Sequence, residues 1–214
     1  MLPAIVCLAA LVVLLFAERA NWRWARAASK MVASSAFVWA AVVWGAEATV
    51  FGQLLLVGLI LCWLGDALLL PSGSSLWFLS GLVSFLLGHL VYAFAFAQMA
   101  LEPVVLGVCA VVVGGASWRI LKWLRPHLPS NFEWPVFAYV AAISLMLILA
   151  LAVSFSGGPL AVGIGALGFA ASDVSVARKR FVSDGFANSA WGLPAYFISQ
   201  LVLAYSVTQV SEFI

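Results

Sequence analysis

Eight long apolar segments, separated by short polar or turn-forming breaks, constrain this chain more than any other feature of its sequence. They cover roughly residues 3–18, 30–45, 49–70, 75–100, 103–121, 133–154, 158–177 and 188–211. A helix that spans a bilayer needs about 17–25 residues. Only 8% of the residues are charged, against about 25% in a soluble domain. The sequence therefore predicts an all-α polytopic membrane protein, a bundle of about eight transmembrane helices in one domain over residues 1–214.

The basic residues test this number of spans. All ten Lys and Arg lie in the breaks after the first, fifth and seventh segments: Arg19, Arg23, Arg26 and Lys30; Arg119, Lys122 and Arg125; and Arg178, Lys179 and Arg180. With eight spans these breaks face one side of the membrane, and the positive-inside rule makes that side cytoplasmic. The second segment is the least apolar, but seven spans would place the first basic break opposite the other two. We therefore expect both termini on the non-cytoplasmic side.

Charge and motifs exclude several classes of function. The net charge of +2, without a long basic run, does not favour nucleic acid binding. The three cysteines lie inside apolar segments, at spacings that suggest neither a disulfide framework nor a zinc site. The sequence contains no P-loop and no dinucleotide-binding glycine pattern. We therefore expect neither a cofactor nor a metal.

Two carboxylates within the apolar segments point to function, because ionisable residues are costly inside a membrane. Asp66 lies five residues before the turn at Pro71, and Asp173 lies five residues before Arg178. Each is predicted roughly 7 Å below the cytoplasmic end of its helix. Two carboxylates at one depth can converge on one cavity, although the alternative that each only reaches the interface or bonds a neighbouring helix stays open.

Further polar residues lie in the same half of the predicted bundle or somewhat deeper. They are Lys30, His89, Tyr92, Tyr139, Arg180, Tyr196 and Gln200. Tyr196 and Gln200 share a helix face by their i, i+4 spacing, and His89 is predicted about 20 Å from its helix end. Each also has an ordinary structural alternative, such as an interfacial anchor, a loop charge, an interhelical hydrogen bond or, for His89, a bond to a backbone carbonyl.

Four motifs in order resemble the YhhN family, the bacterial relatives of the mammalian lysoplasmalogenases. They are WLGDALLL (63–70), FLSGLVSFLLGHLVYAFAF (78–96), ALGFAASDVSVARKRF (166–181) and LPAYFISQLVLAYS (193–206). The resemblance covers roughly residues 28–206. It departs from the family at the second helix, where the usual Lys-Pro appears as Lys30-Met31.

The resemblance implies that the chain hydrolyses the vinyl-ether bond of a lysoplasmalogen, or of a related lysolipid, to a fatty aldehyde and a glycerophospho-alcohol. Asp66 and Asp173 would then be the catalytic acid and base, in either order, because mutual repulsion should keep one of them protonated. The other seven polar residues would bind substrate. The phosphate would lie near Lys30 and Arg180, with the chain running toward His89. The implied location is the bacterial inner membrane, with the site open to the cytoplasmic side.

Two other functions stay open. A proton-linked transporter would use buried Asp residues equally well, although no convincing internal repeat is present. A metal-dependent lipid amidase or esterase generally needs several His, and here only His89 lies in an apolar segment, without an H-E-x-x-H motif. The sequence does not specify the headgroup, the chain length or the oligomeric state.

Overall fold

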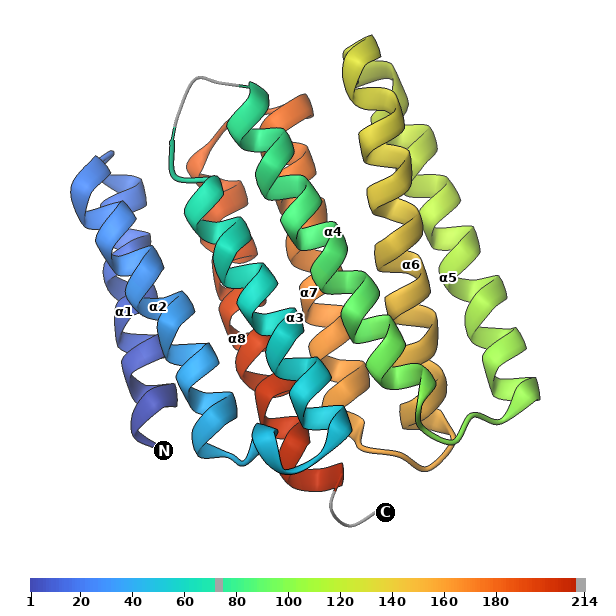
Figure 1. Cartoon of the computed structure of the whole chain (residues 1–214). Coiled ribbons are helices and arrows are strands. Elements are labelled where there is room, and N and C mark those ends of the chain that lie inside the picture. The colour runs from blue at the N-terminus through green and yellow to red at the C-terminus, as the bar shows by residue number, and fades with distance from the viewer. Residues whose placement is uncertain (72–74, 211–214) are drawn as a thin grey trace.

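The computed structural model describes residues 1–71 and 75–210 and consists of helices joined by short connections (Figure 1). The α-helices are α1 (Leu2–Arg19), α2 (Arg23–Val43), α3 (Val50–Leu68), α4 (Ser75–Ala97), α5 (Pro103–Leu124), α6 (Glu133–Phe155), α7 (Leu160–Ala177) and α8 (Phe186–Val210). Three short 3-10 turns, η1 (Ala46–Ala48), η2 (Arg125–His127) and η3 (Ser130–Phe132), lie in the connections. The π-helical turn η4 (Arg178–Val182) extends α7. The predicted all-α fold is confirmed. Part of the predicted break at 71–75 lies outside the described residues.

Seven of the eight α-helices described are long and apolar enough to cross a membrane, which makes the chain an integral membrane protein. The exception is α2, whose hydropathy is lower. The helix α2 begins at Arg23, seven residues before the predicted start at 30. Its first two turns carry Arg and Ala, which both favour helix, and the two arginines lower the hydropathy of this segment. Its buried face, which includes Ser29, Ala33 and Phe37, packs against α1, α3 and α8.

Successive helices run antiparallel, so α1, α3, α5 and α7 all end at the upper end of the bundle in Figure 1. The three basic breaks therefore lie at this one end, as eight helices require. Tryptophan favours the membrane interface, and seven of the eight exposed tryptophans lie toward this end: Trp22, Trp24, Trp77, Trp118, Trp123, Trp134 and Trp191. The eighth, Trp39, lies toward the other end of α2. We call the end of the bundle with the basic breaks the basic end.

The helices α3, α4, α7 and α8 form the centre of the bundle, with α1 and α2 on one flank and α6 and α5 on the other (Figure 1). The helix α5 packs mainly against α6 and buries few of its residues. Close contact between α3 and α4 depends on a glycine, because a Cβ added at Gly58 would lie 2.3 Å from Cε1 of the Tyr92 ring. Tyr92 is fully buried, and its ring packs against the rings of Phe96 and Phe169.

We predict that Gly58→Ala lowers the free energy of unfolding in detergent by about 1–3 kcal/mol, because the added methyl group overpacks the α3–α4 contact. Gly114→Ala on α5 is the matched control, since a Cβ there meets no atom within 4 Å. Its stability should be no lower than that of the unmodified chain. Equal stability of both variants in denaturant titrations would contradict the predicted packing.

Candidate active site

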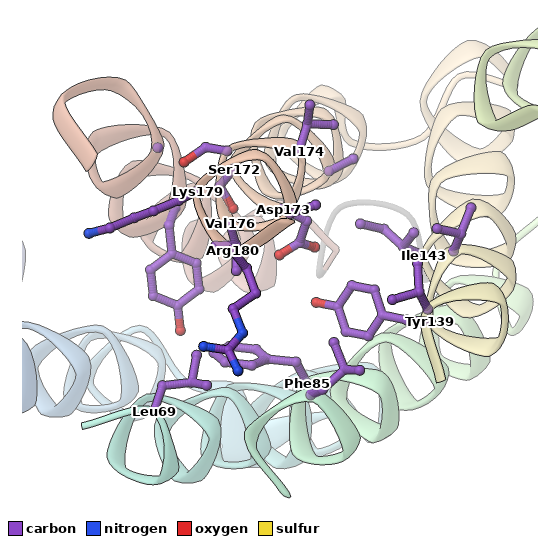
Figure 2. A pocket seen from close by; sticks show the side chains of 18 of the residues that line it. Leu69, Phe85, Tyr139, Ile143, Ser172, Asp173, Val174, Val176, Lys179 and Arg180 are labelled. Atoms are coloured by element: carbon purple, nitrogen blue, oxygen red, sulfur yellow. The ribbon is translucent and has the colours of Figure 1, made fainter. Parts of the chain in front are cut away.

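A cavity of about 800 Å³ extends from the basic end into the bundle. Near that end it is lined by Glu18, Arg26 and Arg180, and further in by residues of α3 to α8. Asp66 and Asp173 both line it, which places the two predicted carboxylates at one cavity. Figure 2 shows part of this lining, with Asp173 and Tyr139 facing each other across the space.

Asp66 is surrounded by hydrogen-bond donors from two other helices. Its Oδ1 lies 3.0 Å from Nζ of Lys30. Its Oδ2 accepts hydrogen bonds from the hydroxyls of Ser34, at 2.6 Å, and Tyr196, at 2.7 Å. The carboxylate is only 2% exposed. Three donors, one of them cationic, fill three of the about four acceptor positions of a carboxylate, so these contacts fit an ionised Asp66.

Asp173 has a different partner, the imidazole of His89. Its Oδ2 lies 3.2 Å from Nε2 of His89, while Nδ1 of the same ring lies 2.6 Å from the backbone oxygen of Phe85. A carbonyl oxygen only accepts, so Nδ1 must carry a hydrogen. The contact between Nε2 and Asp173 then contains one further proton, held either by the ring or by the carboxyl group. This pair therefore stores a proton at the cavity wall.

The depth of Asp173 differs from the prediction. The helix continues from α7 through η4 to Val182, so Asp173 lies roughly 14 Å from the end of the continuous helical segment, about twice the predicted depth. Sequence reasoning ended the helix at Arg178 because three cations follow one another there.

The two carboxylates are linked by ring contacts. Among the described residues no hydrogen bond or ion pair joins them. The Tyr196 ring, whose hydroxyl bonds Asp66, lies 5.5 Å from the Phe169 ring, and Phe169 lies 4.4 Å from the His89 ring, measured between centroids. An apolar aromatic layer therefore separates two polar pairs that share one cavity.

The other predicted residues divide into two groups. Tyr139 and Arg180 line the cavity, with the Tyr139 hydroxyl pointing toward Asp173 and Arg180 extending from η4 into the same space (Figure 2). The Arg180 guanidinium lies 4.6 Å from the centroid of the Phe78 ring.

By contrast, His89, Tyr92 and Gln200 are fully buried and do not belong to the cavity lining, although the sequence prediction had them contact substrate. The Tyr92 hydroxyl donates to Oε1 of Gln200 at 3.0 Å, which joins α4 to α8 behind the cavity. His89 thus contacts a residue of the cavity wall, Asp173, whereas Tyr92 and Gln200 are hydrogen-bonded to each other.

Sequence reasoning missed two sets of polar contacts. Ser34 follows Lys30 by four residues, and this i, i+4 spacing is the signal that could have placed both on the face toward Asp66. At the basic end, Glu18 of α1 pairs with Lys179 and accepts a hydrogen bond from Ser189 at 3.0 Å. That contact joins residues far apart in the chain, and no spacing predicts it.

No group of three or more His, Cys, Asp or Glu side chains that could hold a metal ion occurs within residues 1–71 and 75–210. Two carboxylates of the lining, Asp66 and Asp173, are instead paired with Lys30 and His89.

Several curated proteins are similar in sequence to this chain. Lysoplasmalogenase TMEM86A of Bos taurus is 30% identical over 162 residues, which cover 73% of this chain and 65% of that protein. The human protein of that name is 31% identical over the same shares. A lysoplasmalogenase of Mycobacterium tuberculosis is 32% identical over 67% of this chain and 54% of its own length. The chain therefore spans less than two thirds of the curated relatives that it matches. No solved structure matches it significantly.

The model of the YhhN family matches residues 22–207. This range contains all four motifs, both carboxylates and every polar side chain that contacts them. The chain belongs to the YhhN family.

Proposed function

We propose that this chain hydrolyses the vinyl-ether bond of a lysoplasmalogen or a related lysolipid, releasing a fatty aldehyde and a glycerophospho-alcohol. Relatives that are named lysoplasmalogenases support the reaction class. The observation that carries the proposal is the asymmetry of the two carboxylates at one cavity. The contacts of Asp173 include a transferable proton, and those of Asp66 fit an ion.

The chemistry requires such an asymmetry. A vinyl ether opens when its β-carbon takes up a proton, which leaves an oxocarbenium ion on the carbon bound to oxygen. A positioned acid must therefore deliver a proton to carbon, and an anion nearby must stabilise the positive charge, as paired carboxylates do in glycoside hydrolysis. Water then adds to the cation and loses a proton.

Asp173 is the acid in this proposal. Because Nδ1 of His89 is committed to the Phe85 carbonyl, the single proton between His89 and Asp173 is the one available for transfer. Asp173 is the member of the pair that lines the cavity, so the proton leaves through its carboxyl group. His89 is a positioning residue that holds and supplies this proton.

Asp66 is the anion and base. Its contacts with Lys30, Ser34 and Tyr196 leave one acceptor position of about four, which suits it to receive the proton that the attacking water loses. The resulting hemiacetal collapses to the aldehyde and the free hydroxyl of the glycerophospho-alcohol. The reaction consumes one water. The Asp173–His89 pair loses one proton and Asp66 gains one, so a proton must return from Asp66 to the Asp173–His89 pair before the next cycle.

Arg180 is the residue we propose for the lipid phosphate. It lines the cavity at the basic end, and among the described residues it makes no ion pair. Lys30 is paired with Asp66, and both Arg26 and Lys179 are paired with Glu18. The sequence prediction placed the phosphate near both Lys30 and Arg180. Because Lys30 is already paired with Asp66, we assign the phosphate to Arg180.

The basic end faces the cytoplasm in this proposal, and the membrane is the bacterial inner membrane. The support is the positive-inside rule, since every Lys and Arg lies in the three breaks at that end. The cavity would then open toward the inner leaflet and the cytoplasm.

We predict that Asp173→Asn and Asp66→Asn each lower kcat for aldehyde release at least about hundredfold, because each removes one of the two proton-transfer groups. The measurement is aldehyde formation from an alkenyl lysophospholipid by purified protein, with free fatty acid from an acyl lysophospholipid followed in parallel. Glu47→Gln, the same chemical change in an exposed connection, should retain the full rate. Retained activity in both Asp variants, with monodisperse protein, would refute the assignment.

The ionised state of Asp66 has its own test. Lys30→Met should lower the free energy of unfolding by about 3–5 kcal/mol, because it leaves a buried charge without its cation. The double variant Lys30→Met/Asp66→Asn should recover most of this loss, since the amide carries no charge. Thermal and denaturant unfolding in detergent provide the measurement. A double variant no more stable than Lys30→Met would show that Asp66 is not an ion in the folded protein.

The orientation predicts opposite labelling at two exposed positions. The native cysteines Cys7, Cys62 and Cys109 are buried, so single cysteines introduced by His127→Cys and Glu47→Cys supply the reporters. In intact cells a membrane-impermeant maleimide should label position 47 and not position 127. In inverted membrane vesicles the labelling should be the reverse. Labelling of position 127 in intact cells would overturn the topology.

A further inference from the structure

The cavity continues past the two carboxylates as an apolar groove along α6. Tyr139, Ile143, Leu147 and Leu151 follow one another at i, i+4 spacing, and all four line it. From Tyr139 to Leu151 the row extends about 18 Å along the helix axis. That length is close to the thickness of one leaflet's hydrocarbon, about 15 Å, or half of the bilayer core.

The walls of this groove come from the helices on either side of α6. Val113 and Ile120 line it from α5, and Leu167 and Ala170 line it from α7. Beyond Tyr139, the polar side chains named in this groove are Ser117 and Ser144, whose hydroxyls are hydrogen-bonded to each other, and Ser144 donates to the Val140 carbonyl. Beyond Tyr139 the described residues of the groove therefore offer mainly apolar contact.

The groove opens sideways at membrane depth. Val112 lines the cavity and yet is 63% exposed. It lies twelve residues before the end of α5 at Leu124, which is roughly 18 Å from the basic end. Because Val112 is exposed at a depth that lies within the bilayer, α5 is where the groove comes near the surrounding lipid.

We propose that this groove binds the hydrocarbon chain of the substrate lysolipid, which enters laterally from the bilayer beside α5. The inference rests on the proposed function and names the part of the site that selects the chain. Its support is continuity, because one cavity joins the groove to Arg180 for the phosphate and to Asp66 and Asp173 for the vinyl ether. The path differs from the sequence prediction, which sent the chain toward His89, a residue outside the lining.

Leu147 is the position that sets chain length in this proposal. It lies about 12 Å beyond Tyr139 along α6, so a tryptophan there would close the far third of the groove. Long chains would then meet the indole ring, whereas short chains would end before it. Leu145, two residues away on the same helix, is 46% exposed and does not line the cavity. The same substitution there adds equal bulk on the lipid-facing side.

The test compares octadecenyl and decenyl lysolipids as substrates for the full chain in detergent or vesicles. Leu147→Trp should lower the ratio of kcat/KM for the long chain to that for the short chain at least about tenfold. Leu145→Trp should leave the ratio within about twofold of the unmodified value. An unchanged ratio in Leu147→Trp, or an equal change in both variants, would overturn the proposal.

A second readout is independent of hydrolysis. An alkyl lysolipid with a diazirine at the end of its chain, photolysed in the Asp173→Asn variant, should label α6 around Leu147 and Leu151 or the facing residues of α5 and α7. Labelling confined to the face of Leu145, or to helices remote from the groove, would exclude this path for the chain. Correct labelling without aldehyde release by the unmodified chain would instead preserve the groove and refute the proposed hydrolysis.

Discussion

The cost of burying charge inside a membrane determines the arrangement of this bundle. Each carboxylate in the interior has a partner from another helix, Lys30 for Asp66 and His89 for Asp173. These contacts connect α2 to α3 and α4 to α7, and the Tyr196 hydroxyl ties α8 to the first pair. Leaving either carboxylate unpaired would cost the folded protein several kcal/mol, so these polar contacts stabilise this arrangement of the helices. The cation Lys30, together with Arg23, Arg26 and three serines, also accounts for the low hydropathy of α2.

The two pairs differ in what they can do chemically. In the pair of Lys30 and Asp66, the carboxylate also accepts hydrogen bonds from the hydroxyls of Ser34 and Tyr196. These contacts fit a carboxylate that carries no proton. The pair of His89 and Asp173 contains one proton between two groups that can each carry it. Placing a proton source and a fixed anion at one cavity, separated by aromatic rings, is what protonation of a carbon and stabilisation of the resulting cation require.

The sequence predicted the features that follow from local chemistry. Hydropathy located the helices to within a few residues except at the start of α2, and the distribution of basic residues predicted which helix ends lie together. The cost of buried charge identified Asp66 and Asp173 as lining one cavity. The contact of His89 with Asp173 was not predicted, because the two residues lie 84 positions apart on different helices and no spacing in the sequence indicates that they meet. Nor was the apolar groove, because α5 carries almost none of the family motifs and its role appears only when it packs beside α6.

The central claim is that one proton is stored between His89 and Asp173 because Nδ1 of His89 is committed to a carbonyl. With only two histidines in the chain, nitrogen-15 NMR of protein labelled at histidine, with His127→Gln for assignment, tests this directly. The account predicts a protonated Nδ1, with Nε2 hydrogen-bonded in the unmodified chain and shifted to a free, unprotonated nitrogen in Asp173→Ala, which offers neither a donor nor an acceptor to the ring. An unprotonated Nδ1, or an Nε2 signal that is the same with and without the Asp173 carboxyl group, would contradict it.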